Sequence, residues 1–196
     1  WPEVELELRN LTPDEQLTML SEGRLDAGFG RRVAVPTGYS LEPVHAEPFV
    51  AALPLTHGLA KRKVIDLDDL KGDPFVLFPN EGSGFHAEVL ALCRGAGFVP
   101  EVVQTIAPMH AVIGLVGAGL GVSVVPASVR ALAFNDVRYV TLRGLSNASE
   151  QFLVYDPKRM SAVASRFVEF TRKHVLATAS SSRSAGYART IILTAR

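Results

Sequence analysis

Short strand-like and helical segments alternate along the chain, and this alternation limits the fold more than any single motif does. Residues 4–8 alternate apolar and acidic side chains, residues 13–22 have a helical pattern, and residues 25–29 form the next short apolar run. The helix start reads Thr12-Pro13-Asp14-Glu15, a capping box with proline in the first turn, and Gly23 supplies a left-handed stop. A helical crossover of this size is expected between parallel neighbouring strands. The pattern predicts an α/β fold.

The same alternation continues beyond residue 29. Residues 39–55 are extended but contain Pro43, Pro48 and Pro54, which suits a chain that leaves one sheet and enters another, and we place the crossing near Glu47. The remaining predicted elements are strands at 75–78, 102–104, 122–125, 137–141 and 151–155, and helices at 66–70, 85–95, 109–118 and from Asp156-Pro157 onward.

Charge and cysteine content exclude several classes of protein. The 196 residues include 20 basic and 20 acidic side chains, but five of the basic ones follow Glu169, so residues 1–169 carry a net charge of −5. A duplex-binding surface needs concentrated positive charge, so this chain alone should not bind DNA. Cys93 is the single cysteine; it allows no internal disulfide and falls in the apolar stripe of helix 85–95, which favours a core role over a nucleophile.

Targeting and membrane signals are weak in this sequence. The residues from Trp1 onward lack the charged and apolar regions of a signal peptide. The longest apolar stretch, residues 111–127, is short for a membrane span and is interrupted by four glycines and Pro126. We therefore expect no membrane association and a cytoplasmic location.

Open α/β sheets bind ligands beyond the carboxyl ends of their strands, and the first such position is Gly28 to Arg31. Small residues there allow close approach, and the planar Arg31 guanidinium suits a carboxylate, although a surface arginine paired with an acidic neighbour is equally compatible. Thr12 occupies a similar place at the first helix start, where its hydroxyl is most simply explained as the cap.

Two further positions follow predicted strands. Residues 79–84 precede the helix that begins near Phe85, where free N–H groups attract an anion and Ser83 and His86 could add donors; a plain flexible turn is the alternative. His110, in the third position, is a ligand donor or a structural histidine at the start of the Met109 helix.

Enzymatic signatures are missing from the sequence. No Gly-x-Ser-x-Gly elbow occurs, and His86-Ala87-Glu88 lacks the further zinc ligands of a deaminase because only one cysteine exists. The glycines at 114–121 end a helix and lead into a strand, the reverse of the dinucleotide fingerprint. We expect no catalysis, no cofactor and no metal.

Four stretches together are typical of one family: VELEL at 4–8, the segment from Leu11-Thr12 to EGRLDAGFGR at 22–31, FVLFP at 75–79 and GLVGAGLGVSVVPAS at 114–128. They resemble the effector-binding domain of LysR-type transcriptional regulators, over about residues 1–176. The resemblance implies a two-lobed, periplasmic-binding-protein-like (type 2) α/β fold, each lobe a mostly parallel sheet flanked by helices. The lobes would be 1–46 with 147–176, and 47–146, followed by a Ser/Ala/Arg-rich tail at 177–196.

The same resemblance implies a function. A small anionic inducer would bind in the cleft between the lobes, and Asp26 to Arg31 resembles the branch that senses muconate, benzoate and related acids of aromatic degradation. In this family the domain belongs to a homo-oligomer, a dimer or tetramer, which contacts DNA only through an N-terminal helix-turn-helix head. That head, and the first strand and helix of the domain, would precede Trp1. The inducer contacts implied by the resemblance are Arg31, Thr12, Ser83, Phe85, Met109 and Phe152, to which the strand-end positions add His86 and His110.

Two alternatives stay open from the sequence: an extracytoplasmic solute receptor of the same fold, and a small α/β enzyme. The tail adds a separate hypothesis. Its segment 190–194 is a good strand former, and an unpaired strand edge is a template for another strand. We expect a disordered or crystal-contact tail, and set against it the hypothesis that this segment pairs near residues 4–8 or 27–29.

Overall fold

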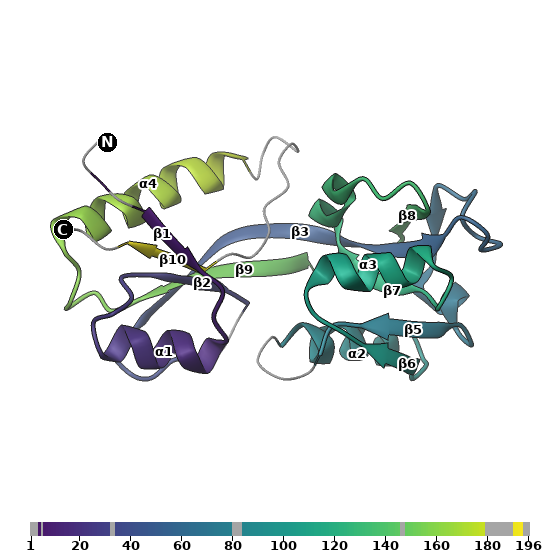
Figure 1. The fold of residues 1–196 in the computed structure, drawn as a ribbon, viewed down its shortest axis with the longest axis horizontal. Coiled ribbons are helices and arrows are strands. Elements are labelled where there is room, and N and C mark those ends of the chain that lie inside the picture. Colours follow the sequence, from purple (N-terminus) through teal and green to yellow (C-terminus); the bar gives the residue numbers. More distant parts are fainter. Residues whose placement is uncertain are drawn as a thin grey trace. The chain divides into compact units, whose positions relative to one another are not determined.

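Backbone contacts divide the computed structural model into two units, Trp1–Ala46 with Glu150–Arg196 and Glu47–Ser149 (Figure 1). The structure describes residues 4, 6–31, 34–79, 84–145, 148–178 and 190–193, with 148, 174–178 and 190–193 described by their backbone alone. The long strand β3 (Ser40–Pro54) and the strand β9 (Ala148–Tyr155) each contribute residues to both units.

In the described part of the first unit, a sheet is covered by one helix on each face. Strand β2 (Gly28–Gly30) pairs antiparallel with β9, which lies next to β3 in the sheet. Helices α1 (Pro13–Ser21) and α4 (Ala162–Thr178) cover opposite faces (Figure 1). The alternation of β9 explains this, because Val154 packs with Met19 and Leu20 of α1, whereas Leu153 and Tyr155 pack with Val168 of α4.

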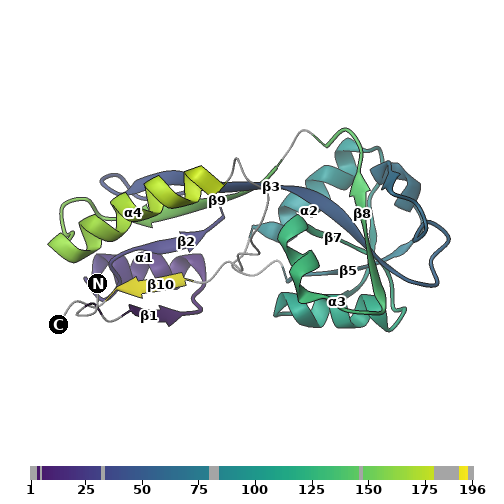
Figure 2. The same cartoon turned by 90° about the horizontal axis from the view of Figure 1, so that it is seen from above.

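The two ends of the described chain meet in this unit. Strand β10 (Thr190–Leu193) pairs antiparallel with β1 (Leu6–Arg9), with Leu8 opposite Ile191 and Glu7 opposite Ile192. Figure 2 shows β10 between β1 and β2. The hypothesis that the tail pairs with residues 4–8 is thus confirmed, and the expectation of a disordered tail is wrong for residues 190–193. The strands on either side of the α1 crossover are not direct neighbours, because β10 lies between them.

The second unit contains the other strands and helices. Within it β3 pairs antiparallel with β7 (Ser123–Pro126) and β8 (Val137–Leu142), whereas β4 (Val64–Ile65) runs parallel to β8 and β5 (Pro74–Leu77) runs parallel to β6 (Glu101–Thr105). A parallel bridge from Phe75 to Val122 joins β5 to the start of β7. Its helices are α2 (Phe85–Gly95), α3 (Met109–Gly117) and the short 3₁₀ turns η1 (Leu67–Leu70) and η2 (Ala127–Leu132).

The core of the second unit is apolar on both faces of its sheet. Helix α2 packs Val89 and Cys93 on one face, and α3 packs Ile113 and Val116 on the other. Cys93 is fully buried, and the loss of solvent raises the pKa of its thiol to about 11. It is therefore a core residue, as the apolar stripe predicted. No helix in the described segments is both long and apolar enough to cross a membrane.

Two details differ from the sequence expectation. The α/β class is confirmed, but the sheets are mixed, since β2 runs antiparallel to β9, and β7 and β8 run antiparallel to β3. The last helix does not open at Asp156-Pro157. Asp156 Oδ1 instead accepts the Lys158 N–H at 2.9 Å, forming a side-chain-stabilised turn. The helix begins at Ala162, where Ser161 Oγ accepts the Ala164 N–H at 3.0 Å.

Candidate functional site

Arg31 follows directly after β2 and is partly exposed. It lines a small hollow of about 10 Å³ within the first unit, beside the apolar ring of Phe152. Phe152 is 3% exposed and lies opposite Gly30 in the β2–β9 pair. Because Arg31 follows Gly30 in the chain, this pairing brings the predicted site residues Arg31 and Phe152 together. The other lining residues are Pro13, Gln16, Leu17, Gly30, Leu41 and Val154. A volume of this size holds about one water molecule, so an aromatic acid would need contacts beyond the hollow.

Thr12 is the cap of α1. Its Oγ1 accepts the Glu15 N–H at 3.4 Å, and the Glu15 carboxylate accepts the Thr12 N–H at 2.7 Å. The Thr12 hydroxyl also donates to the Glu15 carboxylate at 2.9 Å, and the backbone and hydroxyl hydrogen bonds from Thr12 to this carboxylate, the backbone one first, lower the pKa of Glu15 below its ordinary value. The capping box is thus confirmed, and it fixes the start of α1, whose first residue, Pro13, lines the hollow.

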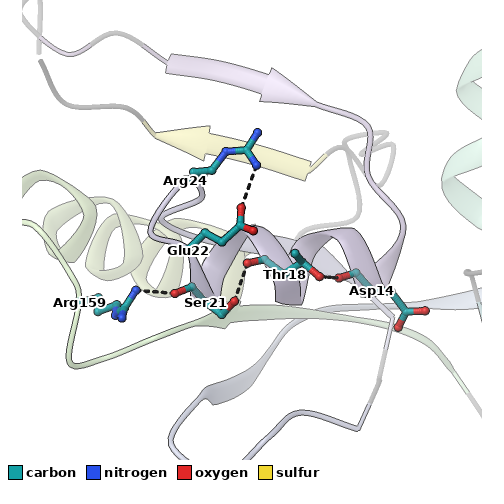
Figure 3. Close-up of polar contacts among 6 residues, drawn as sticks. All are labelled: Asp14, Thr18, Ser21, Glu22, Arg24 and Arg159. Atoms are coloured by element: carbon teal, nitrogen blue, oxygen red, sulfur yellow. Dashed lines mark hydrogen bonds and ion pairs between the residues drawn. The ribbon is translucent and has the colours of Figure 1, made fainter.

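The other end of α1 is fixed by a separate set of contacts (Figure 3). Gly23 adopts the left-handed conformation with φ of 70°, and Arg24 N–H returns to the Met19 carbonyl at 2.8 Å. Arg159, from the turn after β9, donates to the Ser21 carbonyl of the last turn (Figure 3). The exposed Arg24–Glu22 pair adds little, because both side chains are about half exposed or more. The helix that leads to the hollow is therefore held at both ends.

Gln16 is a site residue that the sequence reasoning missed. It lines the hollow, is 6% exposed, and its Nε2 lies 3.3 Å from both the Leu11 and the Phe29 carbonyl oxygens. A Cβ at position 28 would lie 2.3 Å from Gln16 Oε1, so Gly28 makes room for this amide rather than for a ligand. The signal was present in the sequence, since a polar residue interrupts the buried stripe formed with Met19 and Leu20.

The predicted residues of the second unit have different environments. Phe85 is 3% exposed and stacks on Phe49 with 6.2 Å between ring centroids, so it belongs to the core in this structure. His86 Nδ1 lies 2.8 Å from the Phe78 carbonyl oxygen, which requires a proton on Nδ1 and ties the first turn of α2 to the end of β5. Ser83 lies outside the described residues.

Met109 and His110 open helix α3. Met109 is partly buried and packs against both core clusters of the second unit, whereas the His110 side chain is exposed. Among the described residues, no group of three His, Cys, Asp or Glu side chains is arranged to hold a metal ion.

A family model for the LysR substrate binding domain matches residues 1–176. This chain belongs to that family. The LysR domain is 35% identical over 167 residues to the uncharacterized HTH-type transcriptional regulator YnfL of Escherichia coli, which covers 85% of this chain and 56% of the relative. It is 37% identical over 142 residues to the HTH-type transcriptional regulator CatR of Pseudomonas putida, covering 71% of this chain and 48% of the relative. Both relatives are named as transcriptional regulators.

Solved structures share the fold. Full-length CbnR complexed with its target DNA matches with a TM-score of 0.79 at 27% identity, over 85% of this chain and 59% of that chain. The effector binding domain of BenM, solved with its effector benzoate, shares the fold with a TM-score of 0.77 at 23% identity, over 91% of this chain and 81% of that chain. The LysR domain thus spans about half the length of the curated relatives it matches.

Proposed function

We propose that this LysR domain is the sensor part of a transcriptional regulator and binds a small organic anion of aromatic degradation. The observation that carries the proposal is the family match over residues 1–176 together with Arg31 at the carboxyl end of β2. A guanidinium can hold a carboxylate through two parallel N–H···O bonds, and Phe152, Leu17 and Leu41 supply apolar surface beside it. The relatives favour a regulator over a solute receptor, since those compared are named as transcriptional regulators.

A bound aromatic acid needs more contacts than the hollow offers. In the first unit we propose contacts with Arg31, Phe152 and the start of α1 at Thr12. In the second unit we propose ligand contacts with Ser83, His86, Met109 and His110. Phe85 would instead anchor α2 through its packing in the core. Ligand binding would shift the population of conformations, and the full-length regulator, as a homo-oligomer, would pass that shift to a separate DNA-binding head. Sedimentation of the full-length protein measures the oligomer.

Calorimetry with cis,cis-muconate and with benzoate tests the proposal. We expect binding of at least one acid, weakened by about 2 kcal/mol or more in Arg31→Ala, because a charge-assisted contact is lost. Arg24→Ala is the matched control: Arg24 is also an arginine of the first unit but pairs with Glu22 on the surface, so affinity should stay unchanged. Equal affinity in Arg31→Ala would remove Arg31 from the site, and no binding of either acid would overturn the proposed ligand class.

A further inference from the structure

Gln16 connects the segments that follow two strands of the first unit. One of its two hydrogen-bond acceptors, the Leu11 carbonyl, lies between β1 and the Thr12 cap of α1. The other, the Phe29 carbonyl, lies within β2, two residues before Arg31. One side-chain amide therefore fixes the distance between the start of α1 and the end of β2.

The surroundings of this amide leave it little freedom. Its side chain is buried at 6% exposure, and Gly28 approaches it so closely that a Cβ at position 28 would lie 2.3 Å from Oε1. A buried amide in a fixed rotamer holds its hydrogen-bond acceptors at a set separation. An apolar side chain of similar size would leave the Leu11 and Phe29 carbonyls without this donor. Gly28 thus leaves the space that the Gln16 amide occupies.

We propose that Gln16 is a positioning residue: by bonding the Leu11 and Phe29 carbonyls together, it sets the place of the Arg31 guanidinium at the hollow. Gln16 itself need not touch the ligand, since its two described donor contacts are used within the protein. The ligand part of this inference rests on the proposed function of Arg31, but the effect on the backbone at residues 30 and 31 does not.

A double-variant cycle tests the link to Arg31. In calorimetry with cis,cis-muconate, Gln16→Leu should weaken binding about 10-fold, which corresponds to the loss of one hydrogen-bonded restraint. If Gln16 acts through Arg31, the double variant Gln16→Leu with Arg31→Ala should bind no more weakly than Arg31→Ala alone. Additive losses would overturn the proposal, because they would show that Gln16 acts independently of Arg31.

Amide hydrogen exchange provides a readout that needs no ligand. In Gln16→Leu the Gly30 and Arg31 amides should exchange about 10-fold faster after correction for global stability. Met19→Ala is the control: Met19 lies on the same helix and is 7% exposed, but its packing against Leu25 and Val154 involves no hydrogen bond to the Leu11 or Phe29 carbonyl, so the variant should lower global stability without this local change. Equal acceleration in both variants would refute the positioning role.

The two readouts separate failure of the inference from failure of the proposed function. If wild-type protein binds neither muconate nor benzoate, the ligand class is wrong, and the exchange comparison alone decides the role of Gln16. If Gln16→Leu does not fold, Gln16→Asn replaces it, since an amide shorter by one methylene cannot reach both carbonyls. Unchanged exchange at residues 30 and 31 in Gln16→Asn would then count against the inference.

Discussion

Gly121 lies where the turn after α3 approaches β5. A Cβ at this position would lie 2.3 Å from the Pro74 carbonyl oxygen and 2.9 Å from its carbon. The neighbouring Val122 N–H donates to that same carbonyl at 2.8 Å, and Val76 N–H donates to the Val122 carbonyl at 2.9 Å. Close approach of two backbones, rather than a positive φ, is what requires glycine here.

Gly121→Ala should lower the free energy of unfolding by about 2 kcal/mol or more, because the methyl group must push apart two hydrogen-bonded backbone segments. Denaturant unfolding measures the change. The control is Gly95→Ala at the end of α2, where a Cβ meets nothing within 4 Å. There alanine should be neutral or stabilise by up to about 1 kcal/mol. A Gly121→Ala protein as stable as the wild type would show that the two strands can separate without cost.

Helix α4 is attached to the sheet of the first unit by a polar cluster as well as by apolar packing. Arg172 donates to both carboxylate oxygens of Glu42 on β3, at 2.7 and 2.6 Å, and to the Tyr155 hydroxyl on β9 at 2.7 Å. The Tyr155 hydroxyl also donates to Glu42. The Arg172 hydrogen bonds lower the pKa of Glu42, whereas burial, followed by the Glu42 hydrogen bond, raises the pKa of Tyr155.

Glu42→Gln should lower the free energy of unfolding by about 1 kcal/mol at pH 7, a modest value because Arg172 is 47% exposed. A carboxylate with a lowered folded-state pKa stabilises above its unfolded pKa and loses that contribution as the pH falls through the lowered one. The difference between wild type and variant should therefore shrink below about pH 4.

Denaturant unfolding at pH 7 and pH 3 measures this dependence. The control is Glu169→Gln on the same helix, whose Lys173 partner is 68% exposed, so it should leave the free energy of unfolding nearly unchanged at pH 7. A difference between wild type and Glu42→Gln that is the same at both pH values would contradict the role of the charge.

At the scale of the whole chain, the last described strand stabilises the first. Among the described strands β1 pairs with β10 alone, so its backbone groups depend on residues that lie more than 180 positions later. Ile192→Pro should speed exchange of the β1 amides Leu6–Arg9, because proline removes a backbone donor opposite Glu7. Hydrogen exchange monitored by NMR measures this.

Two controls accompany the Ile192→Pro experiment. Ile192→Val keeps the N–H group and should leave exchange of the β1 amides unchanged. The Val76 amide in β5 is an internal reference, since its donor contact is to Val122 in the second unit. Equally fast exchange of β1 in wild type and Ile192→Pro would mean that β10 gives β1 no protection.

The sequence by itself determined the elements whose signals are local. The capping box at Thr12, the stop at Gly23 and the bounds of α2 follow from side chains within one or two helical turns, and the structure reproduces them. The family, and with it the α/β class, also followed from residues that the sequence displays directly. Arg31 at the end of β2 was found because a short strand and a charged residue are adjacent in the chain.

Only the tertiary structure decided what depends on distant partners. The antiparallel pairings of β3 and β9, the burial of Phe85 against Phe49, and the start of α4 at Ala162 rest on contacts or competing local hydrogen bonds that periodicity does not encode. Gln16 is the sharpest case, because its amide reaches the Phe29 carbonyl 13 residues away only once β2 and α1 have packed. Periodicity reports which face of a segment is buried, whereas a hydrogen bond across the fold depends on where two such faces meet.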